Sequence, residues 1–212
     1  MAHRLSAVRA SGRSADTMPI WPFSRREKRA EALSPDQRWA LAATALYTEL
    51  NEGYHDRLIP IAGFDVKAER ESVQEMWGIE GADHAVPALD WLVSEGHRGT
   101  ILSETGREGT AWDLVRVINL SRILYGAGYL TEAQAWASMI QAARSLRATY
   151  SSWGEMGEAF LHGRDWWAKG RSAAFQTAHV RLLDPQNADS PWNQVAWNSM
   201  EPAVSAAEWR SN

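Results

Sequence analysis

Residues 110–125, TAWDLVRVINLSRILY, form a helical pattern that is apolar over most of its circumference. At 100° per residue, one nearly continuous apolar face carries Leu114, Val117, Ile118, Ser121, Leu124 and Tyr125. The opposite side mixes large apolar groups with the charged residues Asp113, Arg116 and Arg122. Because a surface helix normally has only one apolar stripe, this segment predicts a largely buried helix at the centre of the fold.

The charges on this central segment allow two interpretations, because an unpaired buried charge is strongly destabilising. Asp113 and Arg116 are three residues apart and can form an ion pair on the same side of the helix. Trp112 and Arg116 are four residues apart, so the guanidinium group can stack on the indole ring. These pairings explain the cluster as part of the core, whereas a ligand site would use the same side chains.

Helix-start and helix-stop residues divide most of the remaining chain into further helices. Capping boxes are expected where Ser34 precedes Gln37, Thr131 precedes Gln134 and Ser152 precedes Glu155, while Asp65 and Asp83 are expected N-caps. The resulting helices are predicted at 35–51, 66–77, 84–95, 110–125, 132–150, 153–170 and 172–183. The segment HRGTILSETGREG, residues 97–109, contains several glycines without a sustained period and is predicted to be a loop. With no alternating strand pattern, the chain is predicted to be a single all-α domain of six or seven main helices.

The composition of the chain limits the possible classes of protein. Its 212 residues, 45% of them hydrophobic, suit one globular core, and 12 tryptophans predict a core that is aromatic and partly polar. No cysteine is present, which excludes disulfides and thiolate chemistry, and a reducing cytoplasm fits this composition. No apolar run approaches the roughly 20 residues of a membrane-spanning helix. The sequence therefore predicts a soluble, cytoplasmic protein.

Charge is distributed unevenly along the chain. Residues 1–33 carry seven Lys or Arg against three acidic residues, so a net charge of −4 leaves −8 on the rest. This acidic remainder argues against nucleic-acid binding by the folded domain, predicted to span 34–198. The basic segment, residues 1–33, is predicted to be a disordered tail, and Met18 could be the true start of the protein. Alternatively, residues 18–30 could make weak contact with a membrane surface. A C-terminal tail is predicted at 199–212.

Several arginines could together bind an anion. Arg116 and Arg122, with Arg98 or Arg164 if the fold brings them close, could hold a carboxylate or phosphate, and Trp112 could line the site. Arg164 is a single charge within a stripe of core-facing aromatic residues, at three- and four-residue steps, that runs from Trp153 to Trp167. An arginine in such a stripe usually has an acidic partner or an anionic ligand.

A catalytic interpretation uses the histidines. His97, with Asp113 setting its tautomer, or His162, three residues before Asp165, could act as an acid or base on an anionic substrate held by Arg116 and Arg164. No nucleophile or phosphate-binding glycine loop accompanies them, and the scattered histidines offer no metal-ligand spacing. We therefore favour a non-enzymatic module, without metal or cofactor, that binds a protein partner or an anionic small ligand; the sequence indicates no oligomeric state.

The order of several motifs resembles a known family. WALAATALYTELN, LDWLVSEGHR, AWDLVRVINLSRILYGAGYLTEAQAW, SWGEMGEAFLHGRDWW and SPWNQVAW together are similar to domain of unknown function 1266, the bacterial YbeU/YbeR-like proteins, over roughly residues 36–198. The positions that match the family's motif residues are Trp112, Asp113, Arg116, Tyr129, Trp136, Trp153, Gly163, Arg164 and Trp192. The resemblance implies a largely helical bacterial domain and brings no established activity.

Overall fold

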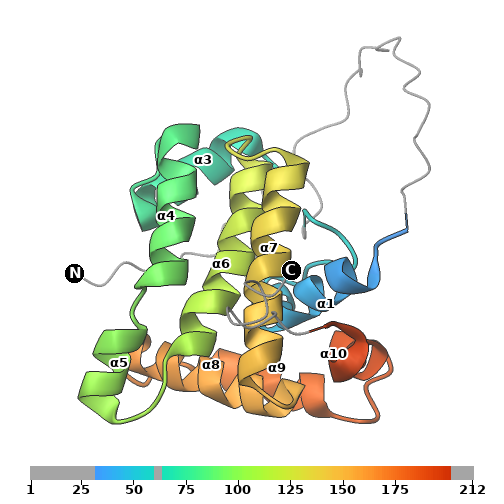
Figure 1. Ribbon diagram of the computed structural model, residues 1–212. Helices are drawn as coiled ribbons and strands as arrows, with labels where there is room; N and C mark the ends of the chain where they lie inside the picture. Colours follow the sequence, from blue (N-terminus) through green and yellow to red (C-terminus); the bar gives the residue numbers. More distant parts are fainter. Residues whose placement is uncertain (1–31, 60–63, 202–212) are drawn as a thin grey trace, which may run out of the picture. The chain divides into compact units, whose positions relative to one another are not determined.

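The computed structural model describes residues 32–59 and 64–201, which contain ten α-helices, one 3₁₀ helix and no strand (Figure 1). The helices are α1 (Pro35–Ala43), α2 (Ala45–Leu50), α3 (Val66–Trp77), α4 (Ala82–Ser94), α5 (Arg98–Thr105), α6 (Thr110–Gly126), α7 (Glu132–Thr149), α8 (Trp153–Ala168), α9 (Ala173–Leu183), α10 (Pro191–Gln194) and η1 (Trp197–Ser199). All of them belong to one compact unit, which begins at residue 33. The predicted all-α class is confirmed, although the helices outnumber the six or seven predicted.

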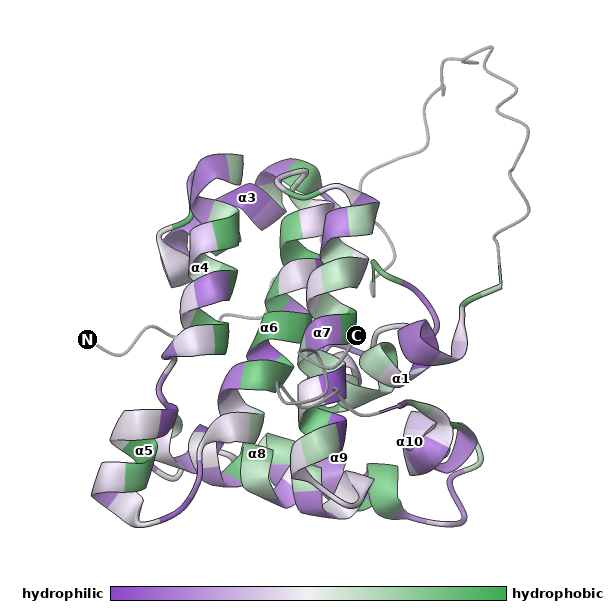
Figure 2. Ribbon diagram, in the orientation of Figure 1, coloured by the Kyte–Doolittle hydropathy of each residue, from purple (hydrophilic) through white to green (hydrophobic). Residues whose placement is uncertain are grey.

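Helix α6 is the central element of this unit. It packs against α1, α3, α4, α5, α7 and α8, and Figure 1 shows it upright beside α7, with α8 and α9 crossing below both. Thirteen of its 17 residues are buried, and Figure 2 shows hydrophobic residues along much of its length. The prediction of a central, largely buried helix at about 110–125 is therefore confirmed.

Most of the predicted helix starts are observed. Ser34 with Gln37 and Thr131 with Gln134 form complete capping boxes, and the Asp65 carboxylate accepts hydrogen bonds from the first turn of α3. At α8 only half of the predicted box forms. Ser152 caps the backbone N–H of Glu155, but the Glu155 carboxylate accepts from the backbone and hydroxyl of Ser151 instead.

The predicted first helix, 35–51, is divided into α1 and α2 at Thr44. The hydroxyl of Thr44 donates to the Leu41 carbonyl and accepts a hydrogen bond from Arg122, which is buried on α6. A long-range contact of this kind leaves no local signal, so the helical pattern of the segment predicted one continuous helix.

The prediction of a loop at 97–109 is wrong, because α5 occupies Arg98–Thr105 within it. Ile101 anchors the helix in the core with no exposed surface. The N-terminal backbone groups of α5 are bound by the carboxylate of Asp113, which lies on α6. A capping residue this far along the chain does not appear in a search for local caps.

The ends of the predicted domain are only partly described. Residues 1–31, with Met18 and the segment 18–30, lie outside the described residues. The predicted C-terminal tail, 199–212, begins within the core, because Met200 is 1% exposed. No helix among the described residues is both long and apolar enough to cross a membrane.

Candidate functional site

The buried carboxylate of Asp113 joins α6 to the start of α5. It accepts backbone hydrogen bonds of 2.9 Å from each of His97 and Arg98, and the Arg98 Nε donates to it at 3.2 Å. The first N–H groups of a helix have no partner within that helix and carry partial positive charge, so a carboxylate placed there stabilises it. Asp113 therefore caps α5 from a neighbouring helix, and this structural role occupies both of its oxygens.

Three indole rings surround the guanidinium group of Arg116, four positions after Trp112 on α6. Its Cζ lies 4.5 Å from the ring centre of Trp77, 4.7 Å from that of Trp112 and 5.6 Å from that of Trp167. These distances are within the range of cation–π attraction. The stacking of Arg116 on Trp112 that we predicted from their spacing is observed, and Trp77 and Trp167 add to it.

His97 adjoins Arg116 and is held as a neutral ring. The Arg116 Nη1 lies 3.0 Å from the His97 Nδ1, and since a guanidinium can only donate, Nδ1 accepts and the ring proton is on Nε2. The Asp113 carboxylate is 3.6 Å from the same Nδ1, too far for a hydrogen bond. The tautomer of His97 is thus set by Arg116, whereas the sequence suggested Asp113.

The pKa of His97 is lowered by burial and by the charge of Arg116, against an opposing effect of Asp113. Because the folded state favours the neutral ring, this stabilisation is present above pH 6.5 and is lost as the pH falls below it. We expect the free energy of unfolding, measured by urea titration from pH 7 to pH 5, to fall less steeply in His97→Gln than in the wild type. The difference should stay below about 1.4 kcal/mol per pH unit.

Burial also lowers the pKa of His162 and of His179, so His97→Gln should retain part of the acid sensitivity. Equal slopes in His97→Gln and the wild type would show that His97 does not titrate in this range.

Tyr47 and Arg164 both pack against the ring of Phe175. Tyr47, on α2, lies edge-on to the rings of Phe160 and Phe175, at 5.5 and 5.4 Å between ring centres. The guanidinium carbon of Arg164, on α8, lies 5.1 Å from the centre of the Phe175 ring. Burial raises the pKa of Tyr47 to about 12, while the charges of Arg116 and Arg164 act in the opposite direction. The hydroxyl of Tyr47 is therefore a neutral group under the influence of two cations.

Several donors in this region have no acceptor. Within residues 32–59 and 64–201, Arg164 forms no ion pair, the Tyr47 hydroxyl makes no hydrogen bond, and the Nε1 of the buried Trp112 has no partner. Trp112 packs directly on α8 at Gly163, where an added Cβ would lie 2.3 Å from the Trp112 Cβ. We refer to Tyr47, Trp112, Arg116 and Arg164 as the arginine–tyrosine site.

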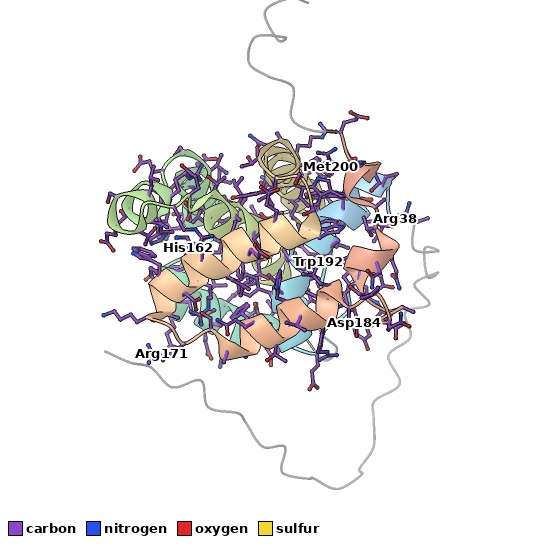
Figure 3. All side chains as sticks on the ribbon, turned by 90° about the horizontal axis from the view of Figure 1, so that it is seen from below. Arg38, His162, Arg171, Asp184, Trp192 and Met200 are labelled. Atoms are coloured by element: carbon purple, nitrogen blue, oxygen red, sulfur yellow. The ribbon has the colours of Figure 1, made fainter. Side chains whose placement is uncertain are left out.

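Two predicted site residues lie apart from this group. His162 faces α5 (Figure 3), where its Nε2 is 3.0 Å from the Thr105 hydroxyl, and among the described residues it forms no bond with Asp165. Arg122 is 1% exposed and directs its five N–H donors to Thr44, Thr48 and the carbonyls of Tyr54, Arg57 and Leu58. It has no donor left for a ligand.

Three aromatic residues in or next to the arginine–tyrosine site were not predicted as site residues: Tyr47, Trp77 and Trp167. Tyr47 and Trp77 lie far upstream of Arg116, and no local pattern connects them with it. Trp167 belongs to the stripe that the sequence assigned to the core, yet it is 53% exposed beside Arg116. In the part of the chain that the structure describes, no three His, Asp or Glu side chains are grouped as metal ligands would be.

A protein-family model described as protein of unknown function (DUF1266) matches residues 100–197 of the chain. This segment belongs to the DUF1266 family. The DUF1266 match begins within α5 and ends at the first residue of η1, so it is shorter than the resemblance over 36–198 on which the sequence prediction rested. Neither the curated proteins nor the solved structures that we searched contain a match to the chain.

The arginine–tyrosine site spans the start of the DUF1266 match. Trp112, Arg116 and Arg164 lie inside the matched segment, whereas Tyr47 and His97 precede it. The DUF1266 segment therefore supplies the cations and the indole donor of the site, and the preceding helices supply the hydroxyl. The family's description includes no activity, so a function has to be argued from the site itself.

Proposed function

We propose that this protein is a non-enzymatic binding module that recognises an anionic group at the arginine–tyrosine site. The observation that carries the proposal is a set of hydrogen-bond donors that have no acceptor among the described residues: Arg164, the Tyr47 hydroxyl and the Trp112 indole, on which Arg116 stacks. The Trp112 Nε1 is buried, a buried donor normally has a partner, and a carboxylate or phosphate supplies only acceptors. Arginine is well suited to both groups because its planar fork can bind two oxygens at once.

The histidines and the carboxylate that a catalytic role would require are less suited to catalysis. The alternative hypothesis makes His97 or His162 an acid or base close to Asp113 and Arg116. His97 is close to both, but its Nδ1 accepts a hydrogen bond from Arg116 and the Asp113 oxygens are engaged by α5. An atom already bonded within the protein cannot take a proton from a substrate until that bond is broken. This arrangement favours binding over proton transfer.

The test is a thermal shift with simple anions at constant ionic strength. We expect acetate, succinate or phosphate, but not chloride, to raise the Tm, because a ligand that binds only the folded state stabilises it. At about 100 times its Kd, a bound anion should raise the Tm by about 5–10 °C. The shift should be much smaller in Arg164→Gln, which removes one cation of the site.

Arg144 provides the matched control, because it is an exposed arginine of α7 that pairs with Asp36 at 2.8 Å. Arg144→Gln should keep the full shift. If no anion stabilises the wild type more than chloride does, or if the shift is equal in Arg164→Gln, the proposed function is wrong. The bacterial origin, the cytoplasmic location and the protein partner expected from the sequence stay predictions.

A further inference from the structure

The charge balance of the arginine–tyrosine site distinguishes between classes of anion. Asp113 is the carboxylate nearest to Arg116, at 3.8 Å, but it lies closer to Arg98, at 3.2 Å, and also accepts two backbone N–H groups. One carboxylate cannot neutralise two arginines. The pair formed by Asp113 and Arg98 is balanced, which leaves the charge of Arg116 uncompensated.

Arg164 adds a second positive charge without a counter-ion. Among the described residues it forms no ion pair, and its guanidinium rests on the Phe175 ring. Asp165 follows it directly in α8, but adjacent residues of a helix do not face each other. The neutral rings of His97 and Tyr47 leave these charges unchanged, so the site carries about two positive charges in all.

From this balance we infer that the ligand of the arginine–tyrosine site is a dianionic phosphate group, as in a phosphate monoester or free phosphate. The inference rests on the proposed function and specifies its ligand. A dianion neutralises both guanidinium groups, whereas a carboxylate or phosphodiester leaves one charge unbalanced in a site of reduced dielectric constant. Three free phosphate oxygens also offer acceptors for two arginines, the Tyr47 hydroxyl and the Trp112 indole together.

Methyl phosphate and dimethyl phosphate test the inference because they differ by one charge and one methyl group. We expect calorimetric titration at pH 7.5 to show methyl phosphate binding at least tenfold more tightly than either dimethyl phosphate or acetate. Inorganic phosphate distinguishes the two sources of the phosphate group. If the natural ligand is free phosphate, inorganic phosphate should bind as tightly as methyl phosphate. If the natural ligand is a phosphate ester, inorganic phosphate should bind more weakly than methyl phosphate. Both results agree with a dianion site.

Two variants examine charge and hydrogen bonding separately. Arg164→Gln should reduce the preference for methyl over dimethyl phosphate to less than threefold, because a single uncompensated charge remains. Tyr47→Phe removes a neutral donor, so it should weaken both ligands by a similar factor and keep the preference. Arg144→Gln should behave as the wild type, and each variant should first be shown to unfold cooperatively.

The outcomes separate this inference from the function on which it rests. If dimethyl phosphate or acetate binds as tightly as methyl phosphate, the site takes a single negative charge: the inference is overturned and the proposed function stands. If none of the four compounds binds, both are wrong. A preference for methyl phosphate that persists in Arg164→Gln would place the dianion elsewhere and would also overturn the inference.

Discussion

Replacing Arg122 by methionine should lower the free energy of unfolding by about 3–5 kcal/mol. The side chain is 1% exposed and its Nε and both Nη groups donate to five oxygens, three of which are backbone carbonyls of Tyr54, Arg57 and Leu58. Methionine has a similar length and can fill the space, but it has no donor. Each buried carbonyl that loses its partner without reaching water costs about 1–3 kcal/mol.

The effect of Arg122→Met is measured by urea denaturation, with Arg144→Met as the matched control. Arg144 also donates a 2.8 Å hydrogen bond, but its side chain is 47% exposed, so its loss should cost less than about 1 kcal/mol. Arg122→Lys should fall between the two, because it keeps the charge and loses the planar fork of donors. Burial lowers the pKa of Arg122 to about 10, so the side chain remains charged at pH 7. Equal losses at positions 122 and 144 would contradict the role of Arg122 as an anchor.

The parts of the fold that the sequence predicted well are those with local causes. The periodicity of 110–125 predicted α6, and the caps at Ser34, Asp65 and Thr131 predicted α1, α3 and α7. The errors lie where a distant side chain decides the backbone. Thr44, where the predicted first helix is divided, is bonded to Arg122, and α5 begins where Asp113 binds its first turn. No window of neighbouring residues contains that information.

The candidate site was likewise predicted well where its residues are close in sequence and poorly where distant residues decide the contacts. Spacing on one helix predicted that Asp113 and Arg116 lie on one side and that Trp112 stacks on Arg116. It could not separate Arg116 from Arg122, six residues later, although the structure directs Arg116 to three indole rings and Arg122 to the carbonyls of 54–58. Both arginines sit on the mixed side of the helical pattern. The packing of α2, α3 and α8 around α6 decides which of them keeps unused donors.

Gly96→Ala should lower the free energy of unfolding by about 3–5 kcal/mol, because two separate costs add. Gly96 has a φ of +56°, a left-handed conformation that costs a residue with a Cβ about 1–2 kcal/mol. The added Cβ would also lie 2.1 Å from the Oδ2 of Asp113, so the carboxylate would have to move. The hydrogen bonds that the carboxylate accepts from the backbone at the start of α5 would then be lost.

Gly106→Ala isolates the first of these costs at the other end of α5. Gly106 has a φ of +70°, and an added Cβ there would meet no atom within 4 Å. The substitution should therefore cost only the conformational penalty of about 1–2 kcal/mol, measured in the same denaturation series. The difference between the two variants estimates what the capping of α5 by Asp113 contributes. If both alanines cost the same, the carboxylate shifts freely, and Asp113 does not hold α5 against α6.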